Sequence, residues 1–202
     1  MGDVIVDLTV SLDGFIAGSD DGPDLPLGRG GERLFTWMNA GPESNRVDRW
    51  LAPPDGSKVV VDEWMSECGA IVSGRRTFDI TGGWKDGHPI DAPIFVLTHG
   101  APTHGEWSPR VSFVTDGLEH ALELAQEAAG DRTVSVSGAD VAQQLVRAGK
   151  LDGIQVSVAP LLLGAGVRLF DHLGGDPIAL EQTRVIASDG VTHLRYRVVR
   201  DA

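Results

Sequence analysis

The chain has 202 residues, of which 42% are hydrophobic and 23% charged, the balance of a globular domain large enough to bury an ample core. Its net charge of −12 argues against a nucleic-acid partner, whose phosphates would be repelled. No apolar run approaches transmembrane length, and no signal-like segment precedes the first predicted strand. We therefore expect a cytoplasmic protein that does not bind membranes.

Cysteine and histidine usage narrows the chemistry further. Cys68 is the single cysteine, so no internal disulfide forms, and its apolar surroundings favour core packing over a reactive thiol. The six histidines show no H-x-x-H or H-x-x-x-H pairing. We therefore predict no metal site.

The first half of the chain alternates strand and helix patterns. Residues 4–10 predict the first strand, and the loop 19–31, rich in Gly, Asp and Pro, is expected to be mobile. The further elements expected here are helices at 32–39 and 59–68, a strand at 70–73, a helix after Thr77, a flexible loop at 82–87 and a strand at 94–97.

The second half continues the alternation and ends differently. Helices are predicted at 118–129 and 140–148, strands at 133–137 and 153–158, and an apolar loop at 160–166. Asp189-Gly190 then separates two long alternating segments, 178–188 and 191–199. Asp-Gly between such segments is a strong hairpin signal.

These elements predict one α/β domain spanning residues 1–202. Strands that alternate with helices form a parallel sheet flanked by helices, and the final segments add an antiparallel hairpin. The expected sheet is therefore mixed but mostly parallel.

Two short segments carry the strongest functional signal, because each has a glycine between a strand and a helix. The first is Ser73-Gly74-Arg75-Arg76-Thr77-Phe78 and the second is Ser137-Gly138-Ala139-Asp140. Such a corner lets backbone approach a ligand and offers the free N–H groups of a helix start to an anion. The two arginines add forked donors suited to phosphate. Two corners on one parallel sheet predict a site for a pyrophosphate-bridged cofactor, and the alternative is a pair of ordinary tight connections.

The chain resembles the dihydrofolate reductase-like superfamily, and most closely the reductase domain of the riboflavin-biosynthesis deaminase–reductase group. The resemblance rests on four motifs in the family's order: residues 11–17 (SLDGFIA), 74–77 (GRRT), 137–139 (SGA) and 161–170 (LLLGAGVRLF). The deaminase zinc motif is lacking, so the chain looks like a free-standing reductase domain. The resemblance implies a three-layer dihydrofolate reductase-like fold and a homodimer, because similar proteins commonly pair.

The resemblance also implies NADPH as the hydride donor. Ile16 and Ala17 would face the nicotinamide, with Arg75 nearest the adenosine 2′-phosphate and Thr98 and His99 as further contacts there. The remaining cofactor residues implied are Gly74, Arg76, Thr77, Ser137, Gly138, Ala139, Asp140 and Val141. For Asp140, capping the following helix is favoured over a contact with phosphate.

Candidates for the catalytic and substrate groups are weaker. Asp13 and Glu32 are the carboxylates considered as proton donors, with a turn aspartate and a solvated first-turn glutamate as the alternatives. Ser157 matches a family position lining the substrate pocket. Trp37 and Trp84 are candidates for stacking on a heteroaromatic substrate, against core packing as the default.

The sequence leaves the function open between an NADPH-dependent reductase of a small heterocyclic or carbonyl-containing metabolite and a sensor that binds a dinucleotide without catalysis. NADH or another hydride carrier is a variant of the first. A doubly wound dehydrogenase is disfavoured, because no G-x-G-x-x-G follows the first strand. For a substrate phosphate, Arg168 is the only basic candidate in a family loop.

Overall fold

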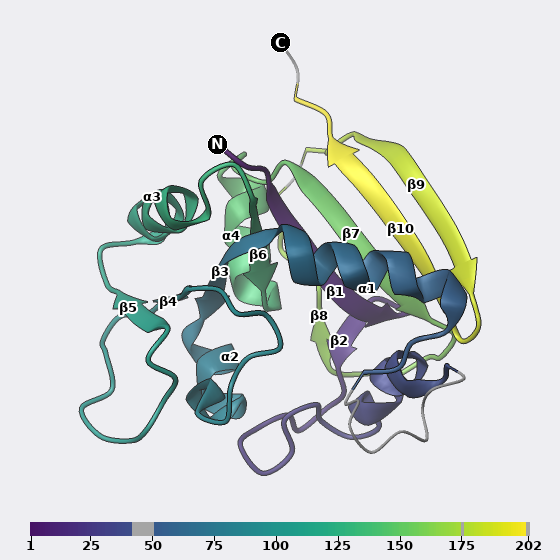
Figure 1. The fold of residues 1–202 in the computed structure, drawn as a ribbon, viewed down its shortest axis with the longest axis horizontal. Helices are drawn as coiled ribbons and strands as arrows, with labels where there is room; N and C mark the ends of the chain where they lie inside the picture. The colour runs from purple at the N-terminus through teal and green to yellow at the C-terminus, as the bar shows by residue number, and fades with distance from the viewer. Residues whose placement is uncertain (42–50, 175, 201–202) are drawn as a thin grey trace.

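The computed structural model describes residues 1–41, 51–174 and 176–200, and its centre is an eight-stranded sheet (Figure 1). The strand order is β5-β4-β3-β6-β1-β7-β10-β9. The strands are β1 (Val4–Ser11), β3 (Cys68–Gly74), β4 (Ile94–Leu97), β5 (Val111–Val114), β6 (Thr133–Ser137), β7 (Gly153–Ala159), β9 (Leu180–Ser188) and β10 (Val191–Val198). The first six in this order are parallel to one another, and β10 and β9 add the antiparallel hairpin.

Helices cover both faces of the sheet. Helices α3 (Leu118–Ala129) and α4 (Ala139–Arg147) pack on the face to which Val4, Val6 and Val72 point. Helix α1 (Asp55–Glu67) crosses the other face (Figure 1), where its Trp64 packs against Cys68 and Ile71. Alternate residues of the strands thus enter two separate cores, as the two-residue period of a strand requires.

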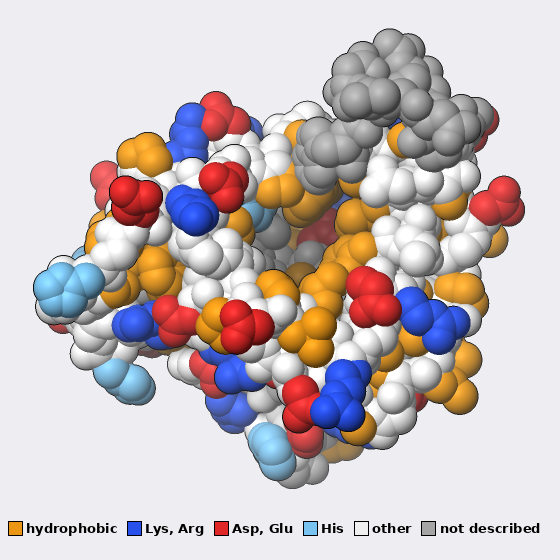
Figure 2. Space-filling view, turned by 90° about the horizontal axis from the view of Figure 1, so that it is seen from below, with side chains coloured by type: hydrophobic (Ala, Val, Ile, Leu, Met, Phe, Trp, Pro, Cys, Tyr) orange, Lys and Arg blue, Asp and Glu red, His pale blue; other side chains and the backbone are white. Residues whose placement is uncertain are grey.

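The remaining elements gather at the carboxyl ends of the parallel strands, on the lower side in Figure 1. A small antiparallel sheet pairs β2 (Phe15–Ala17) with β8 (Val167–Arg168). The short helices are η1 (Gly31–Asn39), α2 (Arg75–Ile80) and η2 (Gly82–Trp84). Seen from below, this side is hollowed near its middle, with hydrophobic side chains around the hollow (Figure 2).

The predicted three-layer α/β fold is confirmed, with local differences. The strand β5 and the small sheet were not predicted, since they are short and present little pattern of their own. Helix α1 begins at Asp55 rather than at residue 59, because Pro54 precedes it with the extended backbone of a helix N-cap. The segment expected as a helix at 32–39 is a 3-10 helix, and α2 begins at Arg75 rather than after Thr77. Among the described residues, none of the helices has the length and apolar character needed to cross a bilayer.

Candidate functional site

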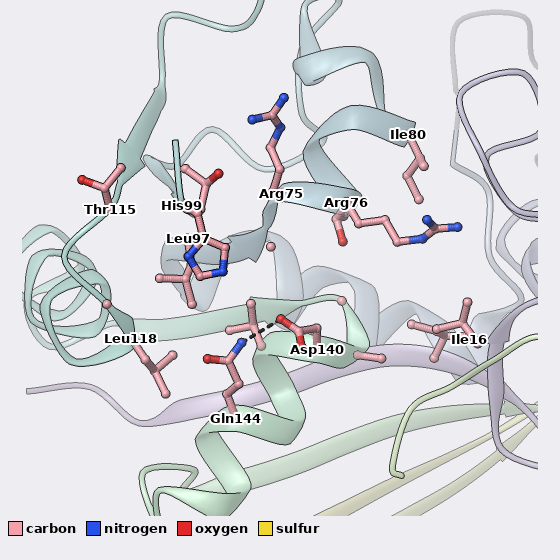
Figure 3. Close-up of a pocket in the computed structure, with 18 of the residues that line it drawn as sticks. Ile16, Arg75, Arg76, Ile80, Leu97, His99, Thr115, Leu118, Asp140 and Gln144 are labelled. Atoms are coloured by element: carbon pink, nitrogen blue, oxygen red, sulfur yellow. Dashed lines mark hydrogen bonds between the residues drawn. The ribbon is translucent and has the colours of Figure 1, made fainter. Parts of the chain in front are cut away.

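A cavity of about 690 Å³ opens at the carboxyl ends of β3, β4, β5 and β6 (Figure 3). Ligands of open α/β sheets bind at this edge, where the loops after neighbouring strands diverge. At one end the cavity is lined by Ile16 and Val167, from the two strands of the small sheet. At the other it is lined by His99, Thr115 and Leu118.

The two glycine corners meet in the middle of this cavity. A Cβ built on Gly138 would lie 2.5 Å from Thr77 Oγ1, and one built on Gly74 would lie 3.5 Å from Val141 Cγ2. Gly138 also has a φ of 101°, a conformation that other residues rarely adopt. Each corner therefore packs on the other, and only glycine fits at position 138.

Helix α4 presents its start to the cavity without a side-chain cap. Its N-cap is Gly138, which has no side chain to bond the first-turn N–H groups, and Ala139 and Val141 line the cavity. The expectation that Asp140 caps this helix is wrong. Its carboxylate instead accepts a hydrogen bond of 2.7 Å from Gln144 Nε2, one turn further on, and both side chains line the cavity (Figure 3).

The two arginines of the first corner point in different directions (Figure 3). Arg75 donates from Nε to the Asp79 carboxylate at 2.9 Å and from an Nη to the carbonyl of Gly100 at 2.9 Å. Arg76 extends toward the Ile16 end and donates to both carboxylate oxygens of Asp21, at 3.1 and 2.7 Å. The same pairing raises the pKa of the Arg76 guanidinium. Both cations are therefore held by carboxylates at the rim of the cavity.

Most of the cofactor residues expected from the sequence come together here. Only Ala17, which is buried in β2, and Ser137, whose carbonyl accepts a hydrogen bond from Ser73 Oγ, do not line the cavity. Those that line it are Ile16, Gly74, Arg75, Arg76, Thr77, Thr98, His99, Gly138, Ala139, Asp140 and Val141.

The carboxylates considered as proton donors lie outside the cavity lining. Asp13 Oδ1 accepts a hydrogen bond from Ser11 Oγ at 2.6 Å, and its two oxygens accept from the backbone N–H groups of Leu163 and Gly164. These bonds, the one from Ser11 above all, lower the pKa of Asp13 to about 2. Asp13 thus fastens the loop after β7 to the end of β1. Glu32 is exposed in the first turn of η1.

The substrate candidates are packed in the interior. Trp37 is 3% exposed and meets the ring of His193 edge-on at 5.1 Å between centroids. Trp84 packs edge-on against Phe78, and the Ser157 hydroxyl is hydrogen-bonded to His193 Nδ1 at 2.8 Å. None of the three lines the cavity.

Several lining residues escaped the sequence interpretation. Asp21, from the loop expected to be mobile, lines the cavity and contacts Arg76, which lies 55 positions further along the chain.

Arg168, considered for a substrate phosphate, instead places its guanidinium 4.4 Å from the centre of the Phe15 ring and donates to the carbonyl of Asp13. Because neighbouring strand residues point to opposite sides, Val167 faces the cavity and Arg168 does not. The other lining residues not singled out are Ile80, Leu97, Gly100, Thr115, Gly117, Leu118, Gln144 and Val167.

Comparison with known proteins agrees with this architecture. An uncharacterized protein, YyaP, of Bacillus subtilis (strain 168) is 23% identical and aligns over 96% of this chain and 93% of its own length. The crystal structure of a putative riboflavin biosynthesis protein from Shewanella sp. PV-4 matches with a TM-score of 0.68 and 25% identity, over 99% of this chain and 100% of that one.

Part of a longer enzyme has the same fold. This enzyme is the diaminohydroxyphosphoribosylaminopyrimidine deaminase/5-amino-6-(5-phosphoribosylamino)uracil reductase of Thermotoga maritima. The match covers 98% of this chain and 57% of that enzyme, with a TM-score of 0.63 and 16% identity. The model of one family, the RibD C-terminal domain, matches residues 3–194. Because that match takes in nearly the whole chain, the protein belongs to the RibD C-terminal domain family.

Proposed function

We propose that the protein is an NADPH-dependent reductase that transfers a hydride to a small heterocyclic or carbonyl-containing metabolite. The observation that carries this proposal is the contact between the two glycine corners on one cavity. Thr77 excludes a Cβ at Gly138, so the backbone at the start of α4 stays bare toward the cavity. A volume of about 690 Å³ has room for a dinucleotide.

The chemistry of the lining fits the parts of such a cofactor. The uncapped start of α4 suits the pyrophosphate, the apolar surface of Ile16 and Val167 suits the nicotinamide ring, and Thr98, His99 and Thr115 suit the adenosine end. When bound, NADPH supplies the hydride. The residues of the chain hold it, orient it and exclude water from its reactive end.

The proton that completes a reduction has a separate origin. At neutral pH the Asp13 carboxylate is ionised, because its pKa is lowered to about 2, and it has no proton to donate. Its two oxygens are already engaged by Ser11, Leu163 and Gly164. We infer that water delivers the proton to the reduced acceptor.

A protein of similar fold supports the class of acceptor that we propose. The Thermotoga maritima enzyme is a reductase of a phosphoribosylaminouracil, a heterocycle that carries a phosphate. In this chain Arg168, the basic residue considered for such a phosphate, stacks on Phe15 outside the cavity. The proposal therefore extends to heterocyclic or carbonyl acceptors in general and is not limited to phosphoribosyl compounds.

Binding and turnover distinguish this proposal from a dinucleotide sensor. The purified chain is titrated with NADPH and NADH by calorimetry, and NADPH oxidation is then followed at 340 nm with pyrimidine, pteridine and aldehyde acceptors. Saturable binding with acceptor-dependent oxidation supports the reductase. Binding without oxidation by any acceptor would favour the sensor, and the lack of binding would refute both.

We also propose that two copies of the chain form a homodimer through the end of the sheet at β9. This strand lies at the sheet edge and is mostly exposed, with Leu180 at 44% and Val185 at 53% exposure. Exposed apolar residues on an edge strand favour its pairing with another chain. Sedimentation equilibrium should give the mass of two chains, and the mass of one would contradict the proposal.

A further inference from the structure

The carboxylate of Asp21 occupies an unusual place for a residue of an exposed loop. Its side chain is only 10% exposed and lines the cavity, while the Arg76 side chain that it holds is 65% exposed. Arg76 donates to both carboxylate oxygens, at 3.1 and 2.7 Å, and also to the carbonyl of Asp21 at 2.8 Å. One edge of the guanidinium is therefore fully used by Asp21.

The loop that carries Asp21 is tied at its base. Gly18 N–H donates to the carbonyl of Leu27, and Arg29 N–H donates to that of Ser19, each at 2.8 Å. A Cβ on Gly18 would lie 2.0 Å from the carbonyl oxygen of Arg29, so the two ends of the loop are in direct contact. The loop is thus a compact projection with a fixed base. Rotation of the Asp21 side chain would free the Nε–H and Nη2–H groups of Arg76 from the carboxylate, while the bond from Arg76 to the Asp21 carbonyl could remain.

A carboxylate and a phosphate present the same arrangement of oxygens to a guanidinium. Arg76 belongs to the glycine corner at the start of α2 and extends along the cavity toward Ile16 (Figure 3). An anionic group of a ligand that accepts two parallel hydrogen bonds from Nε and Nη2 of Arg76 would compete with Asp21 for them. Because Arg76 is largely exposed, water would solvate it readily once Asp21 is removed.

We propose that Asp21 sets the affinity of the cavity for phosphate-bearing ligands by competing with them for Arg76. This inference rests on the proposed function in one respect, the use of the cavity for a phosphate-bridged ligand. It adds that the protein carries an internal carboxylate at the place of one phosphate. The ligand must displace this carboxylate, so the affinity is lower than the corners and Arg76 alone would give.

The test compares the protein with the variant Asp21→Asn, which keeps the size of the side chain and removes its charge. The matched control is Asp20→Asn, on the same loop with the same change in net charge, since Asp20 pairs with Arg29 away from Arg76. Binding of NADPH and of inorganic pyrophosphate is measured by calorimetry. We expect Asp21→Asn to bind both about two- to fivefold more tightly, the range that an ion pair near the surface contributes, and Asp20→Asn to bind as the unchanged protein does.

A second pair of variants tests whether the tighter binding of Asp21→Asn depends on Arg76. In an Arg76→Gln background, Asp21→Asn should no longer tighten binding, because the competed guanidinium is gone. Equal or weaker binding of pyrophosphate by Asp21→Asn, an equal gain in Asp20→Asn, or no pyrophosphate binding to any variant would overturn the inference. Tighter pyrophosphate binding without any NADPH binding would uphold the inference and refute the proposed reductase.

Discussion

Thr77 and Gly138, 61 positions apart in the sequence, are so close that a Cβ on Gly138 would lie 2.5 Å from the Thr77 hydroxyl oxygen. This contact joins the start of α2 to the start of α4. We therefore predict that Gly138→Ala destabilises the fold by about 2 kcal/mol or more, since both the contact and the φ of 101° oppose a side chain. NADPH affinity should fall at least tenfold, as measured by calorimetry on the folded fraction.

Gly149→Ala is the matched control for that change. Gly149 follows the other end of α4, has a φ of 64°, and has no heavy atom within 4 Å of a Cβ built on it. Gly149→Ala should lower the free energy of unfolding by only about 1 kcal/mol, which is the cost of a positive φ for an alanine. Its NADPH affinity should be unchanged. If both variants bind NADPH like the unchanged protein, the corner at Gly138 is not part of a cofactor site.

The guanidinium of Arg75 is held by its bonds to Asp79 and the carbonyl of Gly100, at the end of the cavity that we propose for the adenosine. We predict that Arg75→Ala weakens NADPH binding by about 1–3 kcal/mol and NADH binding much less, because only NADPH carries the 2′-phosphate. Titration with both cofactors measures the difference. Arg29→Ala, which removes an exposed arginine of the loop after β2, serves as the control. Equal weakening of both cofactors by Arg75→Ala would show that Arg75 does not contact the 2′-phosphate.

Asp13 should contribute to stability in a defined pH range. Its pKa is lowered from 3.8 to about 2 in the folded chain, chiefly by the hydrogen bond from Ser11. A lowered carboxyl pKa stabilises the folded state above the unfolded value, and this contribution is lost as the pH falls from about 4 to about 2. Chemical unfolding of the protein and of Asp13→Asn should therefore differ by a constant amount from pH 5 to 8, with the difference shrinking below pH 4. A difference that instead changed near pH 7 would contradict the low pKa.

The sequence predicts elements that have a local pattern better than elements that depend on contacts with distant parts of the chain. The bounds of α3 and β6 agree with the sequence prediction, because the apolar stripe from Leu118 to Ala129 and the β-branched alternation from Thr133 are local patterns. β5 has four residues at the sheet edge, and β2 and β8 are held by each other. Such segments form only once the rest of the sheet is in place, so their own residues give a weak signal.

The same distinction applies to the site. The two glycine corners were predictable, since a strand, a glycine and a helix follow one another in the sequence. The pairing of Asp21 with Arg76 was not, because it depends on how the loop 19–31 folds back. Asp140 shows a third case. An aspartate near a helix start is usually a cap, but Gly138 already takes the N-cap position, so the carboxylate bonds Gln144 inside the cavity instead.

His193 links three elements in the core under α1 and provides the last prediction. It is 2% exposed, with Nδ1 hydrogen-bonded to Ser157 of β7 and Nε2 to Ser57 of α1 at 2.9 Å. Burial, with a smaller effect of the Arg184 charge, lowers the pKa of His193 to about 4. The unfolded chain therefore binds a proton that the folded chain does not between pH 6.5 and about 4, so stability falls as the pH falls through this range.

Between pH 6.5 and 4, protonation of His193 should lower the free energy of unfolding by about 3 kcal/mol. The variant His193→Gln is expected to be less stable at pH 8 but to lose less stability between pH 6.5 and 4, so the two unfolding free energies converge. Urea unfolding at half-unit pH steps measures both curves, and subtraction removes the carboxylates that titrate in the same range. Parallel curves would mean that His193 takes up its proton without unfolding, which the burial of the ring and the nearby Arg184 charge oppose.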